Sequence, residues 1–172
     1  MKSVAIFGIM ASGKTSSGRL LAKKMGYRFY DTDKFIEEDA GMTVQEIFQK
    51  KGESFFRKLE SRVIKDLSSK KKCVIALGGG AITVPGNIRA LKDCFIVSLL
   101  SSAAAIIRRT ENDDSRPLLN VSARRKNIKE LIEKRKPLYL RHAELVIDTS
   151  NLNPAEIASK MSTFIKSKQV LL

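Results

Sequence analysis

The segment GIMASGKT, residues 8–15, carries the first recognisable chemistry in this chain. It matches the pattern G-x-x-x-x-G-K-[ST], in which glycines leave backbone N–H groups free to surround phosphate oxygens. Lys14 would reach the outer phosphates of a nucleoside triphosphate, and the hydroxyl of Thr15 would bind Mg²⁺. Because a predicted strand precedes the pattern and a predicted helix follows it, we interpret it as a phosphate-binding loop.

The predicted ATP contacts extend over this loop into the helix behind it. Ala11 stands where the commonest small kinases have a third glycine, so we expect a slightly altered backbone there, with binding retained. The expected contacts are Gly8, Met10, Ala11, Ser12, Gly13, Lys14, Thr15 and Ser16.

Two carboxylates, Asp31 and Asp33, end the predicted second strand YRFYDTD, residues 27–33. If both residues continue the strand, their side chains point to the same side and could share a metal ion and a substrate. The alternative is a cap on the helix predicted next, which suits Asp33. These residues alone favour neither interpretation.

Three consecutive glycines, Gly78–Gly80, follow the apolar start of VIALGGGAI. Glycines at a strand end indicate a ligand that approaches the backbone closely, or a strained turn. Arg57 and Glu60 are three residues apart on a predicted helix, where such a pair is usually a surface ion pair. Arg116 in SRPLL and Arg135 in EKRKPLY are cations that, taken singly, are more often solvated.

Short apolar runs rich in β-branched residues predict strands, and most of them lead into segments of helical spacing. This alternation indicates an α/β fold, a parallel sheet covered by helices on both faces. The runs are SVAIFG, YRFYDTD, CVIALGG, CFIVSLL and ELVIDTS. Helices are expected at residues 13–25, 34–40, 43–50, 53–69, 86–92, 101–110, 124–135 and 154–168, the last capped by Asn153.

The composition is that of an ordinary globular protein. A chain of 172 residues, 43% hydrophobic and 29% charged, fits one domain with a sizeable core, residues 1–172. The apolar start is too short for a secretory signal and no stretch approaches a membrane span, so we expect a cytoplasmic protein without a membrane partner. Cys73 and Cys94 are expected to be buried hydrophobes, and the net charge of +14 would attract anions.

Residues 110–126 show neither helical nor strand periodicity and mix acidic residues, serine and proline with arginines. A long irregular segment inside a compact domain is often a lid that closes over a bound substrate. We therefore expect a lid at about residues 110–124.

Taken in order, these segments resemble the shikimate kinase family. The resemblance runs from GIMASGKTSSGRLLA through FYDTD, IFQKKGESFFRKLE, VIALGGGAI, RPLL and KRKPLY to VIDTSNLNP. It implies a three-layer α/β/α fold of the nucleoside-monophosphate-kinase kind, with a five-stranded parallel sheet in the order 2-3-1-4-5. A substrate-binding flap at about residues 33–60 and the closing lid would complete this P-loop kinase.

The family's reaction is the transfer of the γ-phosphoryl group of ATP to the 3-hydroxyl of shikimate. It gives shikimate 3-phosphate and ADP, in the route to chorismate and the aromatic amino acids. On the acceptor side the resemblance places Asp33 against the shikimate hydroxyls, and Arg57 and Arg135 around the carboxylate, which guanidinium groups bind in planar two-bond geometry. The backbone that meets the substrate would be that of Gly78, Gly79 and Gly80.

On the donor side, the resemblance gives the lid residue Arg116 a contact with ATP and places Arg109 and Pro154 near the adenine. Leu152 stands there in place of an arginine that many members have. A Mg²⁺ cofactor would be bound by Thr15 and Asp31. Charge on the transferred phosphoryl group needs nearby cations. The expected catalytic residues are Lys14, Asp33 and Arg116.

Two alternatives remain open. A kinase of another small hydroxylated acid, such as gluconate, would explain the phosphate loop but not the combined acceptor motifs. A nucleic-acid-binding NTPase is suggested by a sequence pI of about 10.0. Against it, the chain has no recognisable nucleic-acid-binding module and few aromatic residues for stacking. We expect shikimate and ATP as partners, no nucleic acid, and a monomer.

Overall fold

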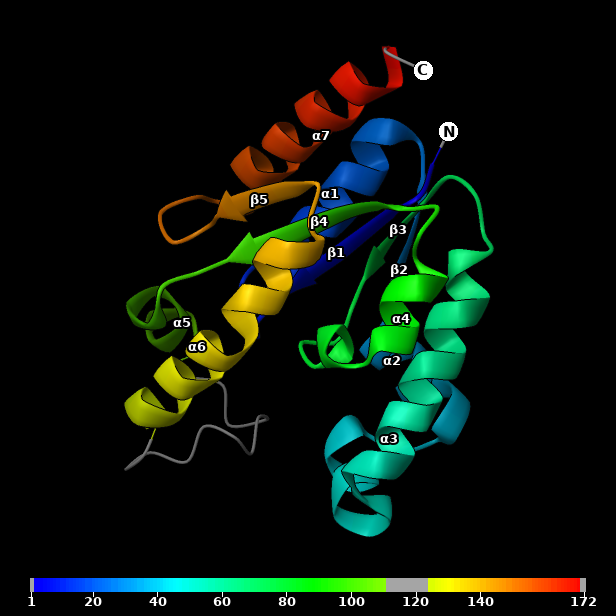
Figure 1. The fold of residues 1–172 in the computed structure, drawn as a ribbon, viewed down its shortest axis with the longest axis vertical. Coiled ribbons are helices and arrows are strands. Elements are labelled where there is room, and N and C mark those ends of the chain that lie inside the picture. Colours follow the sequence, from blue (N-terminus) through cyan, green and yellow to red (C-terminus); the bar gives the residue numbers. More distant parts are fainter. Residues whose placement is uncertain (1, 111–123, 171–172) are drawn as a thin grey trace.

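A five-stranded parallel sheet lies between two layers of helices in the computed structural model, which describes residues 2–110 and 124–170 (Figure 1). The strand order is β2-β3-β1-β4-β5, which confirms the predicted three-layer α/β fold. The strands are β1 (Val4–Gly8), β2 (Arg28–Asp31), β3 (Cys73–Ala76), β4 (Phe95–Leu100) and β5 (Leu145–Asp148).

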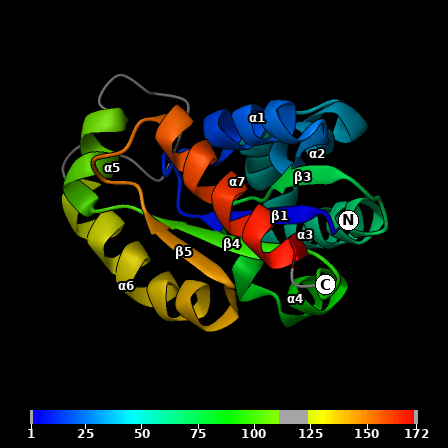
Figure 2. The same cartoon turned by 90° about the horizontal axis from the view of Figure 1, so that it is seen from above.

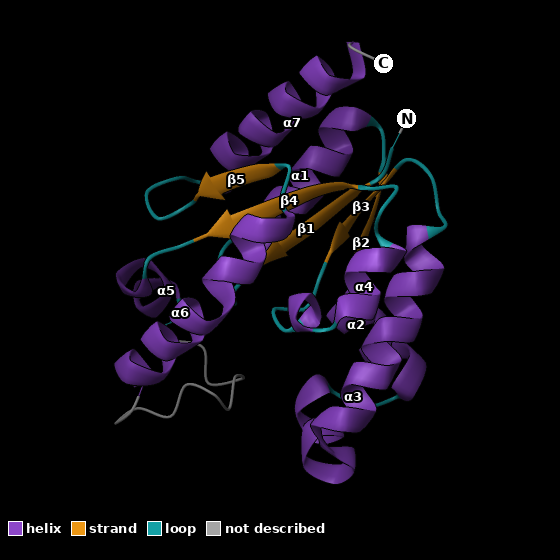
Figure 3. Cartoon of the chain, viewed as in Figure 1, coloured by secondary structure: helices purple, strands orange, loops and turns teal. Residues whose placement is uncertain are grey.

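Helices alternate with these strands along the chain, as Figure 3 shows. A single 3-10 turn, Ala81–Thr83, follows the triple-glycine segment. The α-helices are α1 (Lys14–Met25), α2 (Thr32–Ala40), α3 (Val44–Ser68), α4 (Pro85–Ala90), α5 (Ala103–Arg109), α6 (Arg124–His142) and α7 (Pro154–Val170).

The central strand β1 separates two apolar cores because its side chains alternate between the sheet faces. Val4 and Ile6 pack in the core that α1 and α7 cover, whereas Ala5 and Phe7 pack in the core of α3 and neighbouring elements. Figure 2 shows the two helical layers on opposite sides of the sheet. Burial of a Val, Ile or Phe side chain contributes about 1.5–3 kcal/mol, so Val4 and Ile6 fix one face of β1 and Phe7 fixes the other.

The carboxyl end of β1 lies in the middle of one sheet edge, between β3 and β4. Gly8 ends the strand, and a Cβ at this position would lie 2.6 Å from the carbonyl oxygen of Leu99 on β4. Only a residue without a side chain lets the two backbones approach so closely. The phosphate loop therefore starts at the carboxyl edge of the sheet, where open α/β folds bind their ligands.

Helix α3 joins the two helices predicted at residues 43–50 and 53–69. Its backbone is interrupted at Gly52, which has a φ of 82° and a ψ of 168°. This left-handed φ favours glycine, and it lets one helical segment follow the other across a kink. Thr43 and Glu46 form a capping box that fixes the start of α3.

Helix α6 continues to His142, although the prediction ended it at residue 135. Pro137 lies inside the helix, where proline usually breaks the hydrogen-bond ladder. Tyr139 holds the last turn in place, because its carbonyl accepts a hydrogen bond from Ser98 and its hydroxyl donates to Gly79. His142 is therefore the last residue of this helix.

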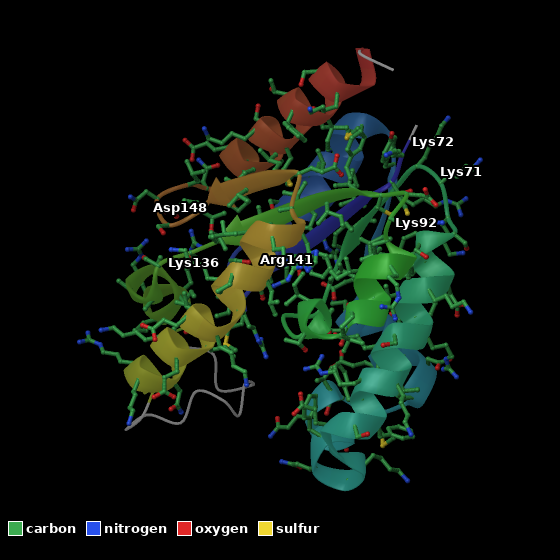
Figure 4. All side chains as sticks on the ribbon, viewed as in Figure 1. Lys71, Lys72, Lys92, Lys136, Arg141 and Asp148 are labelled. Atoms are coloured by element: carbon green, nitrogen blue, oxygen red, sulfur yellow. The ribbon has the colours of Figure 1, made fainter. Side chains whose placement is uncertain are left out.

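Positive charge gathers at the sheet edge where the strands begin. Lys71, Lys72 and Lys92 lie together at this end of the molecule (Figure 4). Helix α3 ends at Ser68, so Lys71 and Lys72 belong to the loop before β3. Cys73 and Cys94 are free and buried, as predicted.

Among the helices in the described ranges, none is long and apolar enough to cross a membrane.

Candidate active site

The phosphate loop connects β1 to α1 and carries a lysine folded over its own backbone. The Lys14 ammonium donates to the carbonyl oxygens of Gly8 at 2.8 Å and Ile9 at 2.9 Å. Gly13 has a φ of 93° and precedes the first turn of α1. The positive end of α1 and the Lys14 ammonium thus face the same loop, an arrangement that favours an anion.

Ala11 adopts a left-handed backbone with a φ of 55°. Glycine accepts this region without strain, whereas a Cβ makes it costly by about 1–2 kcal/mol. Met10 beside it packs against a small apolar cluster of Ile9, Ile106 and Ile128. Ser16 lies in the first turn of α1, with its hydroxyl 3.3 Å from the Gly13 carbonyl oxygen.

The predicted metal ligands meet between α1 and β2. The Thr15 hydroxyl donates to Oδ2 of Asp31 at 2.7 Å. Hydroxyl and carboxylate oxygens suit Mg²⁺, which usually keeps several waters and takes further ligands from substrate phosphates. Within the described segments, no group of three or more His, Cys, Asp or Glu residues is arranged to hold a metal ion.

The helix-cap role discussed for Asp33 belongs to Asp31. Asp31 ends β2 and caps α2, since its Oδ1 accepts the backbone N–H of Asp33 at 3.2 Å. Asp33 lies in the first turn of α2, so the strand periodicity assumed for the pair is wrong. Both carboxylates nevertheless lie at the carboxyl edge of the sheet, because the helix begins directly at the strand end.

Gly78 lies between two carboxylates from different helices. A Cβ at this position would be 2.8 Å from Oδ1 of Asp33 and would collide with Oε1 of Glu60. The Gly78 N–H donates to the hydroxyl of Thr32 at 2.9 Å, which fixes this segment against the start of α2. The missing side chain therefore lets Asp33 and Glu60 approach each other across the backbone.

Glu60 is fully buried, so the sequence-based interpretation of Arg57 and Glu60 as a surface ion pair is wrong. Its Oε2 accepts from the Arg57 guanidinium at 2.5 Å, while Oε1 has no hydrogen-bond partner in the described part of the chain. Burial raises the pKa of Glu60 to about 6, against the opposing effect of Arg57, and Asp33 adds to the rise.

The buried face of α3 explains this position. Phe56, Val63, Ile64 and Leu67 are also buried on α3, and their spacing places them on the face that carries Glu60. Extending this periodicity across the charged residue could have identified Glu60 as a buried acid in the sequence.

The guanidinium of Arg57 lies directly over the glycine segment, because a Cβ at Gly80 would collide with it. Arg57 is also 3.2 Å from Glu53, one turn earlier on α3. Two carboxylates thus orient Arg57, one fully buried and one exposed.

Arg135 and Tyr139 of α6 both donate to the carbonyl oxygen of Gly79, at 3.0 Å and 2.8 Å. Tyr139 is almost fully buried, and burial raises the pKa of its hydroxyl to about 12 against the effect of Arg135. Its hydroxyl therefore stays protonated and remains a donor at neutral pH. Sequence reasoning did not assign Tyr139, although its spacing of four residues from Arg135 places both on one face of α6.

The predicted acceptor residues come together around one short segment. Asp33 and Arg57 approach Gly78 and Gly80, and Arg135 binds Gly79. They come from α2, α3 and α6. The geometry is a carboxylate and two guanidinium groups around a largely buried stretch of backbone, of which Gly79 is partly exposed. This arrangement suits a small acid that also bears hydroxyl groups.

On the other side of the phosphate loop, Arg109 at the end of α5 contacts three loops. Its guanidinium donates to the Ala11 carbonyl oxygen at 3.1 Å and to the Ser101 hydroxyl at 3.2 Å. It also reaches the Leu152 carbonyl oxygen at 3.4 Å, two residues before Pro154 begins α7. The structure thus places the residues predicted near the adenine beside one another. Arg116 and residues 111–123 of the expected lid lie outside the described residues.

Three comparisons with known proteins agree. The family model for shikimate kinase matches residues 10–166. The shikimate kinase of Thermodesulfovibrio yellowstonii is 45% identical over 94% of this chain and 93% of its own length. That of Caldanaerobacter subterraneus is 41% identical over 98% and 99%. Among solved structures, a shikimate kinase from Acinetobacter baumannii in complex with shikimate has a TM-score of 0.93 and 36% identity, covering 98% of this chain and 94% of that one.

Proposed function

The chain belongs to the shikimate kinase family, and we propose that the site around Gly78–Gly80 is where it transfers the γ-phosphoryl group of ATP to the 3-hydroxyl of shikimate. The observation that carries this assignment is the gathering of Asp33, Arg57 and Arg135 around that segment. Shikimate has a carboxylate at one end of its ring and hydroxyl groups at the other. The residues around Gly78–Gly80 offer guanidinium groups to the shikimate carboxylate and a carboxylate to its hydroxyl groups.

In the proposed complex, the shikimate carboxylate lies against Arg57 and Arg135. Glu60 holds Arg57 through a short ion pair, so the guanidinium need not be ordered when substrate arrives. Arg135 shares the Gly79 carbonyl oxygen with Tyr139, which fixes the opposite wall. Charged hydrogen bonds of this kind each contribute about 1.5–3 kcal/mol.

Asp33 is the proposed partner of the reacting hydroxyl. Its carboxylate orients the 3-hydroxyl and accepts its proton as the oxygen bonds to the γ-phosphorus. The bond between the γ-phosphorus and the bridging oxygen then breaks, and ADP leaves with that oxygen. The products are shikimate 3-phosphate and ADP.

Lys14 is the proposed donor-side catalyst. Its ammonium donates to the carbonyl oxygens of Gly8 and Ile9. From this position it can turn to the β- and γ-phosphate oxygens and neutralise the charge that develops during transfer. We propose that Thr15 and Asp31 bind Mg²⁺, which would supply further charge neutralisation between the phosphates.

Other expectations stay predictions. They concern a contact of Arg116 with ATP, closure of a lid at about 110–124, packing of adenine near Arg109 and Pro154, and contacts of ATP with the remaining loop residues. We also predict a single domain over residues 1–172, a monomeric state and a cytoplasmic location.

The test is phosphoryl transfer to a panel of hydroxy acids, followed by release of ADP. Shikimate should be phosphorylated, and NMR of the product should place the phosphate on the 3-oxygen. Gluconate is the matched competitor, because it shares the carboxylate and hydroxyl groups but not the ring. Phosphorylation of gluconate but not shikimate would overturn the proposal.

The nucleic-acid alternative has a separate test. RNA or DNA should leave the rate of ATP hydrolysis unchanged, and retention on heparin should be lost at modest salt, as expected for charge attraction alone. Stimulation of ATP hydrolysis by a polynucleotide would support the alternative.

A further inference from the structure

Ala11 keeps the phosphate loop in a backbone conformation that its own side chain opposes. Its φ of 55° lies in the left-handed region, where a residue with a Cβ is strained. Such a residue persists only when its surroundings fix it. The interactions at its carbonyl group identify what does so.

Arg109 binds this carbonyl oxygen at 3.1 Å across 98 residues of sequence. The same guanidinium lies 3.2 Å from the Ser101 hydroxyl and 3.4 Å from the Leu152 carbonyl oxygen, and it also donates to the Thr149 carbonyl oxygen. One side chain thus joins the phosphate loop to the loops that follow β4 and β5.

The next carbonyl of the loop is held from the same direction. The hydroxyl of Thr149, a fully buried residue, lies 3.1 Å from the Ser12 carbonyl oxygen and 2.9 Å from that of Leu100, so these two acceptors share its proton. It also lies 3.4 Å from the Arg109 guanidinium. A carbonyl and the N–H that follows it point to opposite sides of a planar trans peptide. Holding the Ser12 carbonyl outside therefore turns the N–H of Gly13 toward the inside of the loop, where a phosphate would lie.

We infer that Arg109 is a positioning residue that holds Ala11 left-handed and so keeps the phosphate loop in its anion-binding form, whatever base the nucleotide carries. The inference rests on the proposed function only in that the loop binds the phosphates of ATP. It differs from the adenine contact that the sequence suggested for Arg109, because the contacts above join Arg109 to protein loops.

The two roles predict different results for a ligand without a base. Binding of inorganic tripolyphosphate and of adenylyl imidodiphosphate, an ATP analogue that is not hydrolysed, is measured by calorimetry with Arg109→Met. A positioning role predicts that both ligands bind about tenfold or more weakly, since the competent loop becomes a minor population. A pure adenine contact predicts weaker binding of the analogue alone, and that result overturns the inference.

Arg108→Met is the matched control. It removes the same charge from the neighbouring position of α5, but the Arg108 guanidinium is bonded to the Ser150 carbonyl oxygen at 3.3 Å and not to the phosphate loop. We expect less than a twofold change in tripolyphosphate affinity. An equal loss in both variants would mean that charge alone is responsible, and would overturn the inference.

The effect of Arg109→Met should also be measured in a chain that carries Ala11→Gly. Glycine adopts the left-handed region without strain, so the loop should depend less on Arg109. The tenfold effect of Arg109→Met should shrink to about threefold or less when residue 11 is glycine. The same loss of tripolyphosphate binding in both backgrounds would overturn the inference.

The single change Ala11→Gly keeps the idea testable if Arg109 variants fold poorly. With Arg109 in place, Ala11→Gly should neither weaken tripolyphosphate binding nor lower the midpoint of thermal unfolding. A weaker affinity or a lower midpoint would contradict strain at Ala11. These measurements need no turnover. A chain that fails to phosphorylate shikimate would therefore refute the proposed function while leaving this test intact.

Discussion

The donor and acceptor sides of the proposed active site are built in different ways. The phosphate loop is one continuous segment, Gly8–Thr15, between a strand and a helix. The acceptor side combines residues of α2, α3 and α6 around Gly78–Gly80. Local sequence determines the first, whereas the second exists only after distant helices have packed.

The two sides also differ in how charge is held. On the donor side, Lys14 binds carbonyl oxygens of its own loop and can exchange them for phosphate oxygens. On the acceptor side, a fully buried carboxylate of Glu60 faces the Arg57 guanidinium. Changes on the acceptor side should therefore alter both shikimate binding and stability, and they should leave nucleotide binding unchanged.

The largest expected effect is on turnover by Asp33→Asn. Loss of the carboxylate that we propose to orient and deprotonate the 3-hydroxyl should lower kcat by about 100- to 10,000-fold. The KM for ATP should stay within about twofold, because the phosphate loop is untouched. Steady-state kinetics with both substrates varied measures this. Asp39→Asn on the same helix is the control, and near-normal turnover of Asp33→Asn would remove Asp33 from the reaction.

Arg57→Ala should come next and should act on binding. Loss of a charged hydrogen bond to the shikimate carboxylate should weaken binding by about 1.5–3 kcal/mol, or about 10- to 150-fold. Calorimetric titration with shikimate gives the affinity, and Arg62→Ala, an exposed position on the same helix, should change it little. Unaltered shikimate affinity in Arg57→Ala would contradict the assignment of Arg57 to the acceptor side.

Glu60 should make stability depend on pH. Its pKa is raised from an ordinary 4.5 to about 6, so the folded protein holds this proton more tightly than the unfolded chain. The stability that the neutral acid contributes is fully present below about pH 4.5 and is lost as pH rises through 6, a change of about 2 kcal/mol.

Urea unfolding at several pH values from 4.5 to 7 measures this change. Glu60→Gln should lack it, whereas Glu53→Gln should keep it, because Glu53 contacts the same arginine from an exposed position. Equal pH profiles for the wild type and Glu60→Gln would contradict the raised pKa.

The smallest effect is expected from Tyr139→Phe. This change removes one hydrogen bond to the Gly79 carbonyl oxygen and leaves the ring in place. A net loss of about 1 kcal/mol should raise the KM for shikimate about fivefold and leave the KM for ATP unchanged. Tyr30→Phe on β2 is the control. A change in both KM values would show that Tyr139 supports the whole fold and not the acceptor side in particular.

Sequence patterns predicted the structural features that depend on residues close together in the chain. The strands, their parallel arrangement and the phosphate loop follow from apolar periodicity and one local motif. The boundaries of α3 and α6 did not follow, because Gly52 permits a kink without ending the helix and packing of Tyr139 holds a helical turn beyond Pro137. Tertiary contacts outweighed the local preferences in both places.

The acceptor site shows the same limit more sharply. The family resemblance identified Asp33, Arg57 and Arg135 as its residues, and the structure brings them together. Glu60 was misjudged, since a charged residue beside an arginine looks like a surface pair until the helix face is known to be buried. The helix cap considered for Asp33 lies at Asp31, because β2 ends earlier than its apolar pattern suggests.

Gly78 has a consequence for how this protein can change by mutation. Any larger residue would displace Asp33 and Glu60 together, although the glycine itself has no group that reacts. A single substitution there would disturb acid–base chemistry and carboxylate recognition at once. A change of acceptor is therefore easier through residues that contact neither Gly78 nor the two carboxylates beside it.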